Sequence, residues 1–476
     1  MAHFDLFVVG GGSGGVACAR RAGAYGARVG LAEAGRMGGT CVVRGCVPKK
    51  LMHYGAHFGE LFGTARCYGW QVEPRPALDW DRLIEARNRE IARLTRIYER
   101  LLEDSGVAVF HGRARVIAPG TVEVATGDEG EEGGGARRTE RHTADTILIA
   151  VGGRPSRPDM PGAGHAITSD DALETMTRRP ESIAVVGGGY IGIEQASIYH
   201  GLGVPTTLVV RAPLPLRGFD AELREELTDQ LRGRGLTIRT HTDVFGIDRA
   251  DDGRLVLQTS NLPVEADAVL LATGRKPLPN TGDIGLGELG IEMDDDGAIL
   301  VDAAYRTSMP GIRAVGDCSD HAGRGPDPGA FDLTPIAIAE GRLIADTLFG
   351  GKSHELAYDA VPTAVFGLPQ LAMVGLPEDA ARERGFDVEV FRTSFRPLMY
   401  TLTAEERRTT MKLVVDRATD RVLGCHMVGD DAAEIIQGFA AAITAGVTKA
   451  QLDATVGLHP TAAEEFVTMY RPARQM

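Results

Sequence analysis

Residues 4–15 read FDLFVVGGGSGG, an apolar run that passes directly into a cluster of glycines. Phe4 to Val9 has the pattern of a buried strand, and a helical pattern follows the glycines through Tyr25. A strand, a glycine turn and a helix in this order bring backbone N–H groups to a helix N-terminus, where they bind a pyrophosphate. The stretch therefore predicts a Rossmann-like dinucleotide-binding unit at the start of the chain.

The spacing within this turn strengthens the prediction. Gly10, Gly12 and Gly15 reproduce G-x-G-x-x-G, and a second strand, Arg28 to Ala32, ends in Glu33. A carboxylate at that place accepts hydrogen bonds from ribose hydroxyls. A glycine turn with only a structural role is the alternative, but such a turn would not need the acid.

A second turn of the same kind follows residues 183–186, another strand-like run. It carries three glycines at the same spacing, Gly187, Gly189 and Gly192. A strand, glycine turn and helix that recur in this way indicate an internal repeat of a whole domain.

The second unit lacks the acid of the first. Its second strand, Thr206 to Val210, is followed by Arg211, and Arg217 lies a few residues further on. A carboxylate would repel a ribose 2′-phosphate, whereas guanidinium groups bind it through paired hydrogen bonds. The pattern favours NADP over NAD, and the alternative is two surface arginines on a loop.

Between the two units, residues 38–52 read GGTCVVRGCVPKKLM and hold Cys41 and Cys46. An extended chain would separate these cysteines by roughly 16 Å, whereas a disulfide needs Cα atoms within about 7 Å. The backbone must therefore bend, and Gly45 and Pro48 suit a bend. A pair held close in this way can alternate between disulfide and dithiol. The alternatives are two unrelated thiols or half a zinc site, but no further Cys/His pair follows at zinc spacing, so no metal site is predicted.

Composition excludes several other classes of protein. A chain of 476 residues predicts two to four domains. The formal charge of −14 argues against nucleic acid as the main partner. The sequence contains no run of about 18 apolar residues, so no membrane span is predicted. The N-terminus does not show the charged region, apolar region and cleavage site of a signal peptide. Six cysteines are not a secretory disulfide framework, so we expect a reducing compartment, the cytoplasm.

The remaining elements are predicted from periodicity. We expect a helix over residues 84–103 and a hairpin of residues 121–125 and 139–150 with a solvated tip. Residues 268–276 and 311–317 are expected to return to the first nucleotide unit. A helix should follow Leu333-Thr334-Pro335 and run through Leu348, and the last third should contain strands at 388–395 and 412–427 and then helices.

The two nucleotide units, the C-x4-C pair and a terminal His459-Pro460-Thr461 segment together resemble the pyridine nucleotide–disulfide oxidoreductases over essentially the whole chain. The match is closest to the members that reduce glutathione disulfide. The resemblance implies an α/β fold with two Rossmann-like dinucleotide-binding domains and a C-terminal α+β dimerisation domain. It implies an FAD-binding domain of residues 1–155 and 278–350, an NADPH-binding domain of residues 156–277 and an interface domain of residues 351–476.

The resemblance also implies which residues contact the cofactors, FAD and NADPH. Glu33 would hold the adenosine ribose, Asp317 the ribityl chain, and Arg211 and Arg217 the 2′-phosphate. The other expected contacts are Gly10, Gly12, Ser13, Gly14, Gly15, Thr40, Cys41, Lys49, Thr334, Gly187, Gly189, Tyr190, Ile191, Glu194 and Gly274.

The implied chemistry is an NADPH-dependent reduction of glutathione disulfide. Cys46 would be the thiol beside the flavin and Cys41 the thiol that faces the substrate. Lys49 and Glu194 would pair next to the flavin, and Tyr190 would gate the nicotinamide pocket. In a homodimer with shared active sites, His459, oriented by Glu464, would act from the partner subunit.

Six further positions match the substrate pocket of these members, Ser13, Arg20, Tyr98, Thr334, Ile338 and Arg342. The stretch between Asp317 and Thr334 is several residues longer than expected; we favour a loose insert over an ordered flap. Two other functions stay open. One is a reductase for another low-molecular-weight disulfide. The other is the lipoamide dehydrogenase component of a 2-oxoacid dehydrogenase assembly, against which Arg211 argues.

Overall fold

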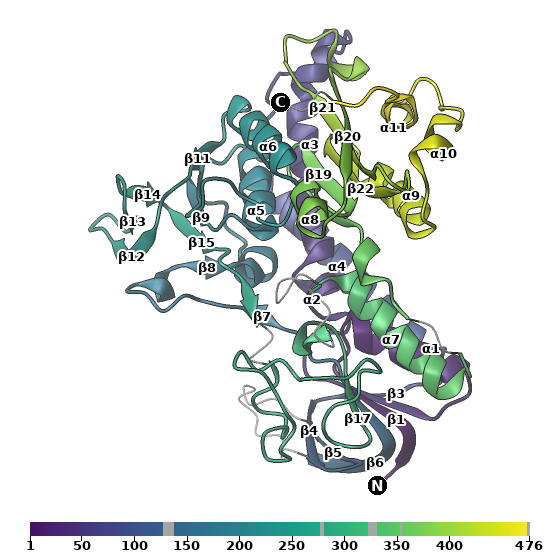
Figure 1. The fold of residues 1–476 in the computed structure, drawn as a ribbon. Coiled ribbons are helices and arrows are strands. Elements are labelled where there is room, and N and C mark those ends of the chain that lie inside the picture. The colour runs from purple at the N-terminus through teal and green to yellow at the C-terminus, as the bar shows by residue number, and fades with distance from the viewer. Residues whose placement is uncertain (127–137, 277–279, 322–330, 353–354, 474–476) are drawn as a thin grey trace.

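The computed structural model describes residues 1–126, 138–276, 280–321, 331–352 and 355–473. Its elements form three main sheets with helices packed on them, in three parts of the molecule (Figure 1). Two of the sheets contain a strand that leads into a glycine turn; one of them is wholly parallel and the other largely so. The third sheet is antiparallel and lies near the C-terminus. The α/β fold with two nucleotide-type units is therefore as predicted.

The first sheet is built on the opening strand. It has the order β3-β2-β1-β6-β5-β4, and β17 pairs with β6 beside this path. The pairings of β1 with β2 and β6 are parallel, whereas β4, β5 and β6 form an antiparallel meander. Its strands are β1 (His3–Val9), β2 (Val29–Glu33), β3 (Ala108–His111), β4 (Arg113–Ala118), β5 (Thr121–Thr126), β6 (Arg138–Ile149) and β17 (Ile312–Ala314).

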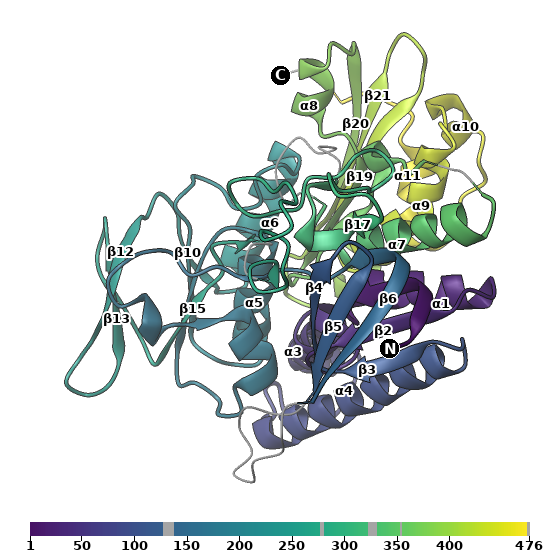
Figure 2. The same cartoon turned by 90° about the horizontal axis from the view of Figure 1, so that it is seen from below.

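Helices cover this sheet and connect it to the redox segment. α1 (Ser13–Ala24) packs against α7 (Thr334–Phe349), and both contribute to a core with Leu6 and Val8 of β1. α4 (Trp80–Glu103) lies along the same part and contacts β3 (Figure 2). The predicted hairpin is confirmed as β5 and β6, while residues 127–137 of its tip lie outside the described ranges.

The second sheet repeats the arrangement. Its order is β11-β10-β9-β15-β8, all parallel, with α5 (Tyr190–Gly201) and α6 (Ala221–Gly233) packed against it. Its strands are β8 (Ile167–Thr168), β9 (Ile183–Val186), β10 (Thr206–Val209), β11 (Thr237–Arg239) and β15 (Ala268–Leu271). A small antiparallel sheet of β12 (Val244–Arg249), β13 (Leu255–Thr259) and β14 (Val264–Ala266) projects from this part (Figure 1).

One prediction about the chain's return is half wrong. Residues 268–271 form β15, which pairs with β9 and so belongs to the second sheet. Residues 312–314 form β17, which does return to the first sheet beside β6. The crossing between the two parts is the short pair β7 (Arg154–Pro155) and β16 (Arg275–Lys276).

The last part contains the antiparallel sheet β18-β19-β22-β21-β20. Its strands are β18 (Thr363–Val365), β19 (Gln370–Gly375), β20 (Val388–Phe395), β21 (Thr409–Asp416) and β22 (Val422–Gly429). The helices are α8 (Glu378–Glu383), α9 (Ala432–Thr444), α10 (Lys449–Asp453) and α11 (Glu465–Thr468). The strand predicted at 388–395 is confirmed, and the run at 412–427 spans parts of two strands.

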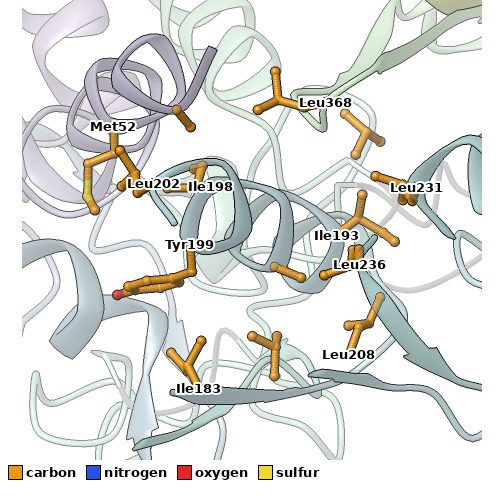
Figure 3. Close-up of a cluster of buried hydrophobic side chains, with 14 of the residues drawn as sticks. Met52, Ile183, Ile193, Ile198, Tyr199, Leu202, Leu208, Leu231, Leu236 and Leu368 are labelled. Carbon is orange, nitrogen blue, oxygen red and sulfur yellow. The ribbon is translucent and has the colours of Figure 1, made fainter. Parts of the chain in front are cut away.

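A buried apolar cluster joins the three parts (Figure 3). Met52 of α3 (Cys46–Cys67) meets Ile198 and Leu202 of α5, and Leu368 adds a side chain from the C-terminal part. This core fixes the helix that begins at Cys46 against the second nucleotide unit. In the ranges that the structure describes, no helix has the length and apolar character needed to cross a membrane.

Candidate active site

The first glycine turn connects β1 to α1 at the rim of a large cavity. Gly10 has φ +108°, and a Cβ there would overlap the carbonyl oxygen of Ala150 on the neighbouring strand end. A Cβ on Gly15 would overlap the carbonyl oxygen of Gly10, so the first turn of α1 lies directly on the glycine turn. Only glycines allow this close approach, and it presents the N-terminus of α1 to the cavity.

The cavity has a volume of about 880 Å³ and runs between the first and second units. It brings together the predicted catalytic Cys46 and most of the residues that the sequence predicts as cofactor contacts: Gly10, Gly12, Ser13, Gly14, Glu33, Thr40, Cys41, Lys49, Tyr190, Ile191, Glu194, Asp317 and Thr334. A glycine cradle, a helix N-terminus and carboxylates along one elongated cavity fit a dinucleotide such as FAD.

Glu33 ends β2 where the sequence predicts a ribose contact. Its Oε2 accepts a hydrogen bond from the N–H of Gly11 at 2.6 Å, and its Oε1 accepts one from Gly35 at 2.7 Å. These two backbone donors fix the carboxylate at the cavity wall, and each oxygen keeps a second lone pair for a ligand hydroxyl.

The redox segment is two helices with a break between the cysteines. Cys41 lies in the short helix α2 (Gly39–Val43), and Cys46 is the first residue of α3. Gly45 makes the break, whereas Pro48 lies within the first turn of α3, where proline is well tolerated. Both cysteines are free thiols in this structure.

The environment of the two thiols separates their acidities. A hydrogen bond with Cys46, together with burial, raises the pKa of Cys41. The same hydrogen bond and the positive charge of Lys49 lower the pKa of Cys46, against the effect of burial. Thr334 at the start of α7 adds a contact of 3.5 Å between its Oγ1 and the Sγ of Cys46. Cys46 is therefore the thiolate of the pair.

Behind the thiols lies a buried ion pair. Lys49 Nζ donates to Glu194 Oε1 at 2.8 Å, and the N–H of Phe366 donates to the same oxygen at 3.0 Å. The side chain of Glu194 is 1% exposed. Burial lowers the pKa of Lys49, but Glu194 and the thiols outweigh that effect and raise it. The sequence predicts this pair.

Phe366 contacts both lysines that follow the redox cysteines, and no sequence motif predicts it. Its ring lies 4.8 Å from Lys49 Nζ and 3.9 Å from Lys50 Nζ, measured to the ring centroid. It lines the cavity from the C-terminal part. No local motif surrounds it, so the sequence carries no signal that would reveal this cation–π contact.

The second glycine turn holds the predicted NADPH contacts. Gly187 has φ +130° between β9 and α5, and Gly192 packs on its carbonyl group. Arg211 and Arg217 are both exposed on the loop after β10, close to this turn because the N–H of Leu216 donates to Gly188 at 2.7 Å. The guanidinium of Arg224 on α6 donates to the carbonyl groups of residues 214 and 215 and shapes the loop.

Gly189 is the residue before α5, and Tyr190, partly exposed, begins that helix. Gly274 lies apart from the cavity wall, between β15 and β16, with φ +145°. Its carbonyl oxygen accepts hydrogen bonds from the N–H and the hydroxyl of Ser156, both at 3.1 Å.

The predicted substrate residues come from three helices that pack together. Arg20 is on α1, Tyr98 on α4, and Ile338 and Arg342 on α7. Burial raises the pKa of Tyr98, Cys41 adds to the effect and Arg20 opposes it, so this phenol lies within electrostatic range of both. Arg342 is exposed, and Ile338 is half-buried.

His459 and Glu464 form the predicted pair but lie elsewhere. Their Nδ1 and Oε1 atoms are 3.0 Å apart, with His459 81% exposed. Among the described residues, the cavity wall includes neither of them. The contact between His459 and Glu464 is therefore observed, and within one chain it lies outside the wall of the cavity that holds Cys41.

Two family models cover this chain. One described as pyridine nucleotide-disulphide oxidoreductase matches residues 4–341, and one for the dimerisation domain of that family matches residues 361–470. A glutathione reductase from Burkholderia cepacia is 47% identical over 466 residues, which are 98% of each chain. One from a Nostoc species is 44% identical over 480 residues, 98% of this chain and 99% of that one.

The likeness extends beyond bacteria. A chloroplastic/mitochondrial glutathione reductase from Pisum sativum is 42% identical over 484 residues, 99% of this chain and 83% of the pea protein. The family models span both nucleotide units, the cysteine pair and the segment with His459. The chain belongs to the pyridine nucleotide–disulphide oxidoreductase family.

Proposed function

We propose that this chain reduces glutathione disulfide, with Cys41 and Cys46 as the redox pair. Its family makes it an NADPH-dependent flavoprotein disulfide reductase with FAD and NADPH as cofactors. The observation that carries the proposal is one cavity lined by the first glycine turn, both cysteines and the buried Lys49–Glu194 pair. Full-length likeness to several glutathione reductases supports the choice of substrate.

Bound FAD supplies the two-electron relay between the nicotinamide and the cysteines. The hydrogen bond with Cys41 and the charge of Lys49 keep Cys46 as a thiolate, and Glu194 holds the Lys49 ammonium in place. Cys41 attacks one sulfur of the substrate and forms a mixed disulfide, and one glutathione leaves as a thiolate. Cys46 then attacks Cys41, which releases the second glutathione and restores the protein disulfide.

The proton of this exchange needs a base, because the pKa of Cys41 is raised in the structure. We assign that role to His459, with Glu464 as its orienting carboxylate. His459 would take the Cys41 proton and return it to the departing glutathione thiolate. Since the cavity of the same chain lacks His459, we propose a homodimer in which each site takes this residue from the partner subunit.

Glutathione disulfide carries about −2 at neutral pH, from four carboxylates and two ammonium groups. The chain itself has a formal charge of −14, so local basic groups must hold the substrate. Arg20 and Arg342 on the packed helices α1 and α7 are proposed for this, with Tyr98, Ser13, Thr334 and Ile338 around them.

The arginine assignment has a direct test. Arg20→Glu with Arg342→Ala should lower kcat/KM for glutathione disulfide by roughly a hundredfold or more, at about 1.4 kcal/mol per tenfold. NADPH oxidation with a small artificial acceptor should stay near normal. Turnover of glutathione disulfide at the wild-type rate would refute the pocket.

The central experiment measures the rate at which purified protein reduces glutathione disulfide with NADPH and, separately, with NADH. Two-electron reduction should produce the long-wavelength absorbance of a thiolate beside oxidised flavin, and Cys46→Ser should remove it. Cys41→Ser should keep the absorbance and lose turnover. If other low-molecular-weight disulfides are reduced better than glutathione disulfide, the second candidate replaces the first.

Two further proposals concern the domain boundaries and the cellular compartment. We propose domain boundaries at residues 155, 277 and 350, since near these residues the strands pass from the first sheet to the second, back to the first, and then to the third. A cytoplasmic setting suits a chain whose six cysteines are all free in the structure. Limited proteolysis and cell fractionation, respectively, would test them.

A further inference from the structure

His321 lies between two carboxylates beside the cavity. Its Nδ1 is 2.7 Å from Oε1 of Glu340, and its Nε2 is 3.3 Å from Oδ1 of Asp332. Ionised carboxylates accept hydrogen bonds and do not donate them, so both ring nitrogens must carry protons. Burial alone would lower the pKa of His321, but the hydrogen bonds to Asp332 and Glu340 raise it to about 10. The ring is therefore an imidazolium at neutral pH.

Glu340 connects this imidazolium to the cofactor side of the cavity. It lies on α7 with 0% of its side chain exposed. Its Oε2 accepts from the N–H of Gly316 at 2.8 Å, directly before Asp317, and its Oε1 also accepts from the Tyr358 hydroxyl at 2.7 Å. In the described ranges, His321 is the basic group that pairs with Glu340. Without it a carboxylate would be buried unpaired.

Asp332 connects the same imidazolium to the thiols. It lines the cavity together with Leu333 and Thr334, and the carbonyl of Leu333 accepts the first hydrogen bonds of α7. The next residue, Thr334, places its hydroxyl 3.5 Å from Cys46 Sγ. That hydroxyl favours the thiolate, because a donor to a charged form stabilises it.

We propose that His321 is a positioning residue for Cys46: by bridging Glu340 and Asp332 it holds Thr334 against the thiolate. The inference rests on the proposed function, because it concerns the same redox pair. The groups that face His321 are Glu340 of α7, Asp332, and the ring of Phe331. Near Glu340, the hydroxyl of Tyr358 also contacts the hydroxyl of the buried Tyr305 at 2.8 Å. Residues 322–330, the middle of the longer stretch between Asp317 and Thr334, lie outside the described ranges.

The test uses the reduced holoenzyme and the thiolate absorbance of Cys46 as a function of pH. His321→Gln removes the charge and one hydrogen bond, so the apparent pKa of Cys46 should rise by about one unit, the worth of one hydrogen bond to a charged group. Thr334→Val should give the same rise. The double variant should add little to either single change, because both act through one hydroxyl.

A matched control separates positioning from stability. His142 is a different buried histidine, on β6 of the first sheet. His142→Ala leaves a cavity, so it should lower the melting temperature without changing the pKa of Cys46. If His321→Gln does not fold, the isosteric variant Asp332→Asn replaces it in the test. That variant should also raise the pKa of Cys46.

A folded His321→Gln protein, or Asp332→Asn in its place, with the wild-type Cys46 pKa would overturn the proposal. That outcome is distinct from failure of the proposed function. The function fails if wild-type protein shows no thiolate absorbance and no turnover of glutathione disulfide, whereas the positioning role fails in variants of an active enzyme.

Discussion

Lys49 and Glu194 show how a buried ion pair controls a neighbouring thiol. Taking both charges out of water is costly, and the cost is offset only because Glu194 accepts from Lys49 and from the N–H of Phe366. Once held there, the ammonium acts on Cys46 through a medium with little screening. After the hydrogen bond with Cys41, the charge of Lys49 is therefore the main influence that lowers the pKa of Cys46.

Replacing Lys49 with Met should show both effects. The lowered pKa of Cys46 means that its thiolate exists at pH values above that pKa and is lost as the pH falls through it. Without Lys49 the pKa rises, so alkylation of Cys46 by iodoacetamide should need higher pH. Glu194 would be stranded, at a cost of about 3–5 kcal/mol in unfolding free energy.

Lys50→Met is the matched control for that change. Lys50 also lies over the Phe366 ring, but Glu194 is hydrogen-bonded to Lys49 and not to Lys50. We expect a smaller shift in the alkylation profile and a smaller loss of stability. Equal shifts in the two variants would show that bulk positive charge, and not the ion pair, sets the Cys46 pKa.

Arg211 and Arg217 should determine the choice of cofactor. Both are exposed on a loop tied to the second glycine turn, where a ribose 2′-phosphate would lie. Changing both to Gln should raise KM for NADPH by roughly ten- to a hundredfold and KM for NADH by less than about twofold. Arg249 is exposed at the end of β12 in the same unit, and Arg249→Gln should change neither KM. Parallel rises for the two cofactors would remove both arginines from the phosphate site.

At the scale of elements, β6 places a neutral histidine inside the first sheet. His142 packs against Phe4 and Phe7 of β1 and Phe110 of β3, with ring centroids 5.8, 5.8 and 4.5 Å away. Burial lowers the pKa of His142, although Glu140 lies 3.8 Å from Nε2, and neither ring nitrogen has a hydrogen-bond partner in the structure. Protonating this ring in the fold is unfavourable.

Stability should therefore fall with acid. The unfolded histidine has a pKa of about 6.5, above the folded value, so the unfolded state binds the extra proton first. The contribution of His142 is complete above about pH 6.5 and is lost as the pH falls, by about 1.4 kcal/mol per unit of pKa difference. Melting temperatures at pH 7.5 and 5.5 should differ less in His142→Phe than in wild type.

The control for this pH effect is His241→Asn. His241 is exposed with φ +50°, a left-handed conformation that asparagine tolerates. Between pH 7.5 and 5.5, the melting temperature of the His241→Asn variant should fall as much as that of wild type. If the melting temperature of His142→Phe falls between pH 7.5 and 5.5 as much as that of wild type, other buried histidines such as His53 account for the acid sensitivity.

The sequence predicts the elements whose signal is local. Both glycine turns, their flanking strands and the long helix α4 carry clear patterns, and the structure has them. α3 was not predicted, because Gly55, Gly59 and Gly63 weaken its helical pattern. The reason for one of them is tertiary: a Cβ at Gly59 would lie 2.8 Å from the Gly201 carbonyl oxygen, so glycine lets α3 approach α5.

Sheet membership and long-range contacts are less accessible to sequence. Residues 268–271 read as a strand in either nucleotide unit, and only pairing with β9 places them in the second. At the candidate site, the glycines, cysteines and Lys49 follow from motifs. Phe366 and the His321–Glu340 pair do not, since each joins residues far apart in the chain without a shared pattern.

At the scale of the whole molecule, the C-terminal part is fixed to the rest by buried charges. Lys412, with 1% of its side chain exposed, contacts Asp220, Glu222 and Glu378 at 3.0, 2.9 and 2.7 Å. Glu60 of α3 accepts from Arg234 and Arg407, each at 3.0 Å. Breaking such clusters costs several kcal/mol per unpaired ion, so a movement of this part that brought His459 to its own Cys41 would be unfavourable.

Mixed dimers test the proposal that a second copy supplies His459. Cys41→Ser and His459→Ala homodimers should each be nearly inactive. In a heterodimer, the site with an intact Cys41 would receive His459 from the other chain and regain about half of wild-type activity, or about a quarter in a random mixture of chains. If His459 served its own chain, neither site of the heterodimer would be complete. Turnover of glutathione disulfide after unfolding and refolding the two variants together, against each refolded alone, decides between these arrangements, and a fully active monomer by light scattering would exclude the shared site.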